Sequence, residues 1–243
     1  MPHPIHLSVL SAACAFGIAC IAPAHAAEET PAIRAELRFA ATGILKDHHT
    51  LWLHAGPGRE PLEVRLNVRT FSEPVRYDGA PAAKFYATPA AARSAAPEEK
   101  PLATATLKEG GMLLVMVPAA DTYRAFPIDS AKFPYQSFRF ANLSEGLVRV
   151  EIGRQAANLK PGASQTLAFP SGEPSLGVRI FSQVRGAEPR LIRQSKWSLF
   201  EDQRELVLFF IDPTTGLVQS RHFVDTKTPE PTGMQASATA PGA

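Results

Sequence analysis

The stretch FPYQSFRFANLSEGLVRVEI, residues 133–152, decides how the rest of the chain is interpreted. Apolar residues occupy every second position on both sides of NLSEG, as at Phe138 and Phe140 before it and at Val148 and Val150 after it. Such alternation around an Asn/Ser/Gly-rich turn is typical of a β-hairpin. We therefore expect a hairpin here that opens a second β-rich domain, with the Phe-Pro pair at its start as the hinge.

Strand patterns recur along the chain at intervals of about ten residues, whereas helical periodicity is hard to find, as in sandwiches and barrels. Residues 62–68, LEVRLNV, alternate apolar and polar positions, so one face of this strand should cover a core. The run MLLVMV, residues 112–117, is apolar throughout and predicts a central strand covered on both faces. Further strands are expected at residues 35–40, 50–54, 75–77, 84–87, 102–107, 123–128, 165–169, 176–183, 190–195, 205–211 and 218–224.

The strand patterns of the two halves follow the same order along the chain. LEVRLNV resembles LGVRIFS at residues 176–182, and residues 101–129 resemble residues 189–225. Two similar units predict an all-β fold of two tandem antiparallel β-sandwich domains of immunoglobulin-like type, at residues 27–132 and 133–225. DPTTG, residues 212–216, predicts a tight hairpin turn with Gly216 in a left-handed conformation.

The two ends of the chain have unusual compositions. Residues 7–22 are apolar and small and precede Ala24-His25-Ala26, which predicts a cleaved signal peptide over residues 1–26. Both cysteines, Cys14 and Cys20, lie inside it, so we expect an exported chain without disulfides or thiolate chemistry. Residues 226–243 predict a disordered tail. Residues 87–101, rich in Ala, Pro and charge, favour a mobile surface loop, with a short helix as the alternative.

Charge and hydropathy limit the classes of partner. The chain has 25 Lys and Arg against 23 Asp and Glu, too small an excess for a dedicated nucleic-acid surface. Single arginines at Arg65, Arg139, Arg149 and Arg179 are expected on the solvent faces of strands. No other stretch is long and apolar enough to span a bilayer, so we expect no membrane insertion of the mature chain and a periplasmic or secreted location.

The pattern FPxxSFRFxNLSxxxVxxxIG at residues 133–153, together with Trp197 before an apolar strand and the DPxTG turn, resembles a group of exported bacterial β-sandwich proteins of uncharacterised function. The resemblance covers most of the mature chain. It implies an envelope location and a tandem sandwich. Because its motifs are structural, it transfers no catalytic residue.

The best metal candidate is the group Asp47, His48, His49 and His54, since imidazoles and a carboxylate suit zinc or copper. Adjacent histidines on an extended backbone point to opposite faces, however, and a polar turn followed by a histidine-bearing strand explains them equally. We expect no cofactor.

Aromatic rings can stack on the faces of sugars, and the candidates are Trp52, Tyr86, Tyr135 and Trp197. The alternative is packing within the core or across strands, the commoner use of aromatic residues on β-strands. Phe85 and Tyr86 are neighbours on one strand, so their rings lie on opposite faces and one of the two can be exposed.

No nucleophile elbow, phosphate-binding loop, dinucleotide fingerprint or zinc-protease motif occurs in the sequence. We therefore expect a non-catalytic envelope protein that binds another envelope protein or a cell-surface glycan through sandwich edges and loops. Two alternatives stay open. One is a carbohydrate-binding module. The other is a pilus-chaperone-like protein, which would lend an alternating apolar strand, MLLVMV being the one comparable segment, to an open groove of its partner.

Overall fold

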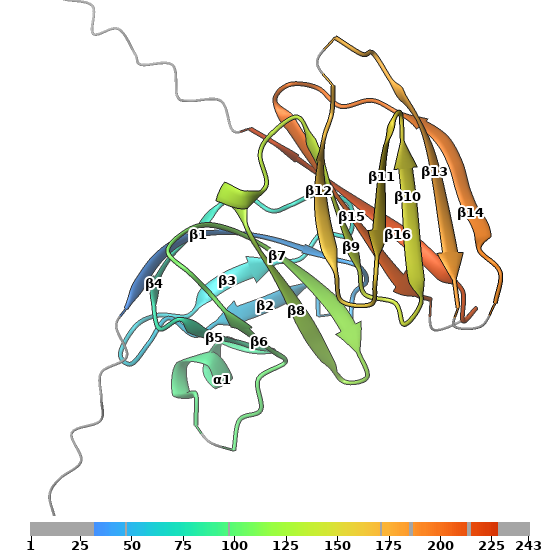
Figure 1. Cartoon of the computed structure of the whole chain (residues 1–243). Helices are drawn as coiled ribbons and strands as arrows, with labels where there is room; N and C mark the ends of the chain where they lie inside the picture. Colours follow the sequence, from blue (N-terminus) through green and yellow to red (C-terminus); the bar gives the residue numbers. More distant parts are fainter. Residues whose placement is uncertain are drawn as a thin grey trace, which may run out of the picture. The chain divides into compact units, whose positions relative to one another are not determined.

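The computed structural model describes residues 32–46, 48–96, 98–170, 172–184, 187–212 and 215–227 (Figure 1). The predicted signal peptide and residues 228–243 of the predicted tail lie outside the described residues. Within the described part, no helix has the length and apolar character needed to cross a bilayer.

The described residues form four four-stranded sheets, so the fold is all-β and consists of two similar, sandwich-like halves. In the first half, sheet A has the strand order β4-β1-β7-β8 and sheet B the order β3-β2-β5-β6. These strands are β1 (Ile33–Ala41), β2 (Thr50–Leu53), β3 (Leu62–Arg65), β4 (Val75–Gly79), β5 (Ala82–Tyr86), β6 (Ala103–Thr106), β7 (Gly110–Ala119) and β8 (Thr122–Asp129).

The second half repeats this topology strand by strand. Sheet C has the order β12-β9-β15-β16 and sheet D the order β11-β10-β13-β14, so each strand corresponds to the one eight positions earlier. The strands are β9 (Ser137–Asn142), β10 (Leu147–Ile152), β11 (Gln155–Leu159), β12 (Ser164–Ala168), β13 (Leu176–Gln183), β14 (Arg190–Trp197), β15 (Gln203–Ile211) and β16 (Val218–Thr226). Thr226, expected to begin the tail, is the last residue of β16.

One strand pair in each half is parallel, so the prediction of purely antiparallel sandwiches is wrong. β1 runs parallel to β7, from Ala35 opposite Gly110 to Ala41 opposite Met116, and β9 runs parallel to β15. Between the paired strands the chain crosses to the other sheet and returns twice, which provides the long connection that parallel pairing requires.

The expected hairpin over residues 133–152 is also wrong. β9 pairs with β12 and β15 in sheet C, whereas β10 pairs with β11 and β13 in sheet D. The NLSEG segment therefore joins the two sheets of a sandwich. The other predicted turn is confirmed: β15 and β16 pair antiparallel from Ile211 opposite Val218, and Gly216 has φ 65°. Pro213 and Thr214 of this turn lie outside the described residues.

Three apolar cores hold the sheets together, and the two central strands β7 and β15 each contribute to two of them. Met112, Leu114 and Met116 of β7 pack into the core between sheets A and B, whereas Leu113 and Val115 pack between sheets A and C. The prediction that MLLVMV is central and covered on both faces is confirmed. β15 follows the same rule: Val207 and Phe209 lie in the core between sheets C and D, and Leu206 and Leu208 face sheet A.

The stretch expected to be a mobile surface loop contains helix α1 (Pro89–Ser94), the alternative left open for its alanines. Thr88 caps the helix, its hydroxyl oxygen accepting a hydrogen bond from the Ala91 N–H at 3.2 Å, and Pro89 provides a suitable first residue. Ala92 is buried. A second, three-residue 3-10 helix, η1 (Ser130–Lys132), joins β8 to the connection that enters β9.

Candidate functional site

Two of the four aromatic rings expected to bind glycans are buried. Tyr86 on β5 is 1% exposed and Trp197 at the end of β14 is 8% exposed. Phe85 lies in the core between sheets A and B, so Tyr86 points to the opposite face of β5, against which helix α1 lies (Figure 1). The helix explains why neither neighbour is exposed. Burial also raises the pKa of the Tyr86 phenol.

Trp197 is part of an aromatic cluster inside the second half. Its ring centroid lies 5.5 Å from that of Phe138 and 6.2 Å from that of Phe140, and the imidazole of His222 meets it edge-on at 4.8 Å. Trp52 is half-buried on β2, opposite Tyr86. Trp52 therefore lies opposite a buried residue, and the four candidate aromatic residues do not form one exposed platform.

The candidate metal ligands do not converge in the described part of the chain. Nδ1 of His54 donates a hydrogen bond to the Ala92 carbonyl oxygen at 2.7 Å, so this histidine ties β2 to helix α1. His48 is half-buried and His49 is exposed. Asp47 lies outside the described residues, and the described ones contain no group of three or more potential ligands close enough to hold an ion.

Tyr135 lies where the two halves meet, beside a hollow of about 410 Å³. The Arg204 guanidinium lies over its ring at 4.6 Å and over the Phe133 ring at 5.2 Å. Partial burial raises the pKa of the Tyr135 phenol, an effect that the nearby positive charge of Arg204 opposes. Arg204 donates to the Asp225 carboxylate at 2.7 Å, and Arg38 binds the other oxygen of the same carboxylate. Both guanidinium groups thus already bind a carboxylate within the chain.

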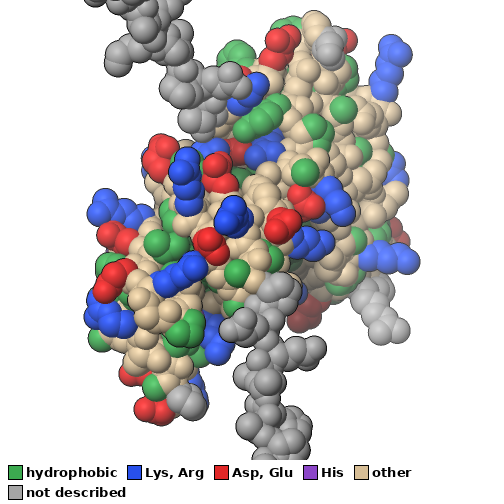
Figure 2. All heavy atoms as spheres, turned by 90° about the vertical axis from the view of Figure 1, so that its left-hand side faces the viewer, with side chains coloured by type: hydrophobic (Ala, Val, Ile, Leu, Met, Phe, Trp, Pro, Cys, Tyr) green, Lys and Arg blue, Asp and Glu red, His purple; other side chains and the backbone are tan. Residues whose placement is uncertain are grey.

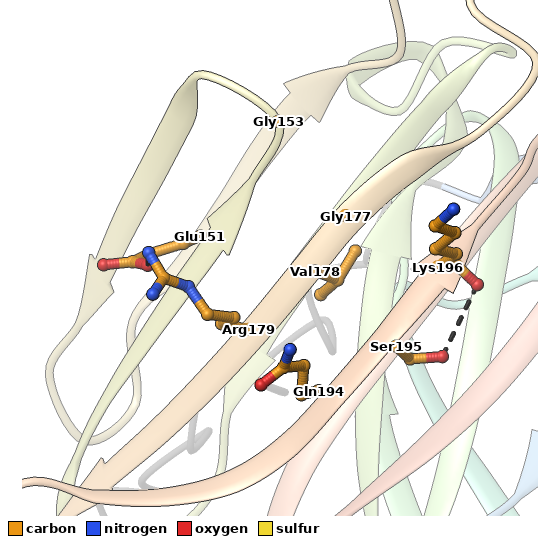
Figure 3. Close-up of a pocket in the computed structure, with 8 residues that line it drawn as sticks. All are labelled: Glu151, Gly153, Gly177, Val178, Arg179, Gln194, Ser195 and Lys196. Carbon is orange, nitrogen blue, oxygen red and sulfur yellow. Dashed lines mark hydrogen bonds and ion pairs between the residues drawn. The ribbon is translucent and has the colours of Figure 1, made fainter.

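A larger hollow, of about 770 Å³, lies on the outer face of sheet D (Figure 3). Two glycines form its floor, and the Gly153 N–H donates to the Gly177 carbonyl oxygen at 3.0 Å. A Cβ atom added to Gly177 would have no neighbour within 4 Å, so this part of the backbone is open to a ligand. Gln194 and Lys196 of β14 line the opposite side (Figure 3).

The side chains around this hollow carry a net positive charge. Glu151 accepts a hydrogen bond from Arg149 at 2.9 Å and forms an ion pair with Arg179 at 2.7 Å, so one carboxylate serves two guanidinium groups. Lys196 has no ion-pair partner among the described residues. Hydrogen-bonding cations over a glycine floor suit an anionic ligand.

β14, which forms one wall of the hollow, is also the edge strand of sheet D. It carries Arg190, Arg193 and Lys196, and in the described part of the chain none of the three forms an ion pair. The corresponding strand of the first half, β6, has only four residues, ATAT, and no charge. The repeat thus shows that the basic edge is a property of the second half alone.

Sequence patterns located β14 but not its role. Arg65, Arg149 and Arg179 are exposed as expected, and the cations of the site were present in the sequence as solvent-facing residues. Arg139 is half-buried, contrary to expectation, and its guanidinium donates to Ser164 Oγ at 3.1 Å and to the Lys132 carbonyl oxygen at 3.4 Å. The sequence does not reveal the strand pairing that makes β14 an edge strand and leaves its cations without carboxylate partners in the described structure.

No family model matches this chain, and no curated protein matches it. The fold therefore stands on its own geometry, and the resemblance of residues 133–153 to exported bacterial proteins supplies no family assignment.

Proposed function

We propose that this protein is an exported, non-catalytic binding protein whose second half binds an extended acidic polypeptide of the cell envelope along β14. The observation that carries the proposal is the uncompensated basic edge strand: eight residues, three cations and no described carboxylate partner. In this proposal residues 1–26 act as the export signal and the two sandwich-like halves as immunoglobulin-like domains.

An edge strand presents a row of unpaired backbone N–H and C=O groups, and an extended peptide can pair with it to continue the sheet. Lys and Arg on such a strand also deter pairing with neutral strands, which protects the protein from aggregation. The same charges attract an acidic strand, so they select the partner as well as guard the edge.

Glycan binding is the second candidate, because the hollow beside Lys196 would also accept an anionic sugar chain. Binding of a neutral glycan is less favoured, because it needs exposed aromatic rings and both Tyr86 and Trp197 are buried. The pilus-chaperone-like alternative needs a free basic anchor between the halves. Arg38 and Arg204, which occupy that position, bind Asp225 instead. On the face in Figure 2, positive and negative side chains are interspersed, without a field of one sign.

The proposal is tested with an eight-residue peptide of alternating Glu and Val, titrated against the purified protein. We expect saturable binding that weakens with salt and slows hydrogen exchange of β14 amides. The double variant Arg190→Gln/Lys196→Gln removes two cations from the strand. Exposed ion pairs contribute about 0.2–1 kcal/mol each, so affinity should fall about fivefold.

Lys84→Gln/Arg124→Gln is the matched control, because both residues are exposed on strands of the first half and neither forms an ion pair in the described structure. It should bind the peptide like the unaltered protein. Equal losses in both double variants would reduce the effect to overall charge and overturn the proposal. Binding of alginate, an anionic polysaccharide, without protection of β14 amides would favour the glycan function instead.

A further inference from the structure

In each half, the edge strands of the two sheets lie beside each other along a seam: β6 and β8 in the first half, β14 and β16 in the second. The contacts across this seam differ between the halves. In the first half the Tyr123 N–H of β8 donates to the carbonyl oxygen of Leu102, next to β6, at 2.7 Å, and this bond closes the seam. Among the described residues of β14 and β16, no backbone hydrogen bond joins the two strands. Side chains connect this second seam instead.

Four polar side chains form a continuous hydrogen-bonded chain in the second seam. His222 of β16 has Nδ1 2.6 Å from Glu205 Oε1 and Nε2 3.4 Å from Ser220 Oγ. Because Glu205 accepts the Nδ1 proton, the other nitrogen of a neutral His222 offers a lone pair. Nη1 of Arg193 lies 3.3 Å from both this nitrogen and Ser220 Oγ.

Arg193 is the charged member that lacks a counter-ion. Its two side-chain partners are a neutral hydroxyl and an imidazole, and no carboxylate in the described part of the chain pairs with it. A hollow of about 320 Å³ adjoins it, lined by Ile192, Arg193, Val218, Gln219 and Ser220. A guanidinium beside an open hollow, with a hydroxyl at hydrogen-bonding distance, matches the fork of donors that a carboxylate accepts.

The order Glu205, His222, Ser220 is that of a carboxylate–imidazole–hydroxyl triad, the arrangement used in nucleophilic catalysis. The guanidinium of Arg193 lies against the imidazole nitrogen that would have to act as the base. A guanidinium N–H at that position occupies the lone pair that a general base needs. The guanidinium charge favours a bound anion, so the cluster suits anion binding better than general-base chemistry.

We infer that the seam between β14 and β16 is a binding site for a single carboxylate group, held by the Arg193 guanidinium and the Ser220 hydroxyl. His222, fixed by Glu205, is a positioning residue that orients both donors. The inference rests on the proposed function and deepens it, since it names the group of the acidic polypeptide that is recognised. That carboxylate can belong to a Glu side chain or to the end of a peptide.

Trp197 gives a direct readout because its ring touches His222. In a Trp52→Phe background, tryptophan fluorescence is followed while three peptides are titrated. Acetyl-Val-Glu-Val-amide carries one side-chain carboxylate, acetyl-Val-Gln-Val-acid carries one terminal carboxylate, and acetyl-Val-Gln-Val-amide carries none. We expect a saturable change with at least one of the first two peptides, which identifies the source of the carboxylate, and none with the third.

Arg193→Gln should lower the affinity for the responding peptide at least tenfold, and Ser220→Ala by about threefold. Arg124→Gln, the same change at an exposed arginine of β8 that forms no ion pair in the described structure, should leave it within twofold. An unchanged thermal midpoint shows that each variant is folded. Arg193→Lys keeps the positive charge but removes the paired N–H donors of the guanidinium. It should therefore retain more affinity than Arg193→Gln but less than the unaltered protein.

The inference is overturned if no carboxylate peptide changes the Trp197 signal, or if Arg124→Gln loses as much affinity as Arg193→Gln. If either result is found while the eight-residue Glu/Val peptide still binds, only the carboxylate site is overturned and the proposed function stands. Loss of both kinds of binding overturns the proposed function as well.

Discussion

At the residue scale, the junction between the halves depends on one carboxylate, Asp225. Its side chain is 0% exposed, and it binds Arg38 and Arg204, whose side chains are 17% and 7% exposed. Arg204 also donates to the carbonyl oxygens of Ser130 and Phe133, so the cluster ties β16 to the connection that leaves the first half.

Replacing Asp225 with Asn leaves two largely buried guanidinium groups without a counter-charge. Removing one partner of a buried ion pair costs about 3–5 kcal/mol, so we expect the free energy of unfolding in urea to fall by that amount. Asp121→Asn is the control, because its side chain is 79% exposed and pairs with Lys46 on the surface. That change should leave the free energy of unfolding almost unchanged, because solvent screens the exposed pair. A loss for Asp225→Asn no larger than the control's would show that the cluster does not hold the halves together.

Residue-scale prediction from the sequence succeeded where local alternation decides exposure and failed where another element covers the face. Arg149 and Arg179 are exposed, as alternation along β10 and β13 predicts. Tyr86 is buried because α1 packs on its side of β5, which no local pattern around Tyr86 records. The Arg193 site depends on β14 and β16 lying beside each other. These strands belong to different sheets, so only the topology of the fold shows that they meet.

At the element scale, the NLSEG segment shows how a correct turn pattern can accompany a wrong strand pairing. Asn142 is fully buried and fixes this crossing between sheets: its amide donates to the carbonyl oxygens of Gly146 at 2.7 Å and Leu159 at 2.9 Å. Its side-chain oxygen accepts from the N–H and the hydroxyl of Ser144. The segment therefore turns as predicted, but it leads β10 away into sheet D.

Asn142→Ala removes all four of these hydrogen bonds and leaves buried backbone carbonyls without donors. Each such group costs about 1–3 kcal/mol, so the protein should lose about 2–6 kcal/mol of stability, measured by urea unfolding. Asn158→Ala is the matched control, because Asn158 is exposed on the neighbouring strand β11. A loss under about 1 kcal/mol for Asn142→Ala would mean that water replaces the amide and that the crossing does not depend on it.

Most strands were predictable from period-two alternation, and the exceptions have physical reasons. β11, QAANL, was missed because it lacks β-branched and aromatic residues, and its alanines are equally common in helices. The similarity of residues 101–129 to 189–225 is confirmed as β6–β8 against β14–β16. The match of LEVRLNV to LGVRIFS is wrong, since β3 corresponds to β11 and β13 to β5. Short alternating strands resemble one another whatever their place in a sheet.

At the scale of the whole molecule, the duplicated halves share a core as well as a topology. Leu113 and Val115 of β7 meet Leu206 and Leu208 of β15 in the core between sheets A and C. This shared core is as apolar as those inside each half, which argues that the halves unfold together. The chain offers a natural test, because each half contains one of its two tryptophans, Trp52 and Trp197.

In Trp197→Phe the remaining tryptophan reports on the first half, and in Trp52→Phe on the second. We expect both proteins to show one thermal transition, with Leu206→Ala lowering the midpoint reported by either tryptophan, since deleting a buried leucine side chain costs about 2–5 kcal/mol. The reciprocal variant Leu37→Ala, in the first core, should lower the midpoint reported by Trp197. If each leucine change moves only the tryptophan of its own half, the shared core does not couple the halves. They would then be independent domains joined at Phe133, as tandem sandwiches on a hinge would be.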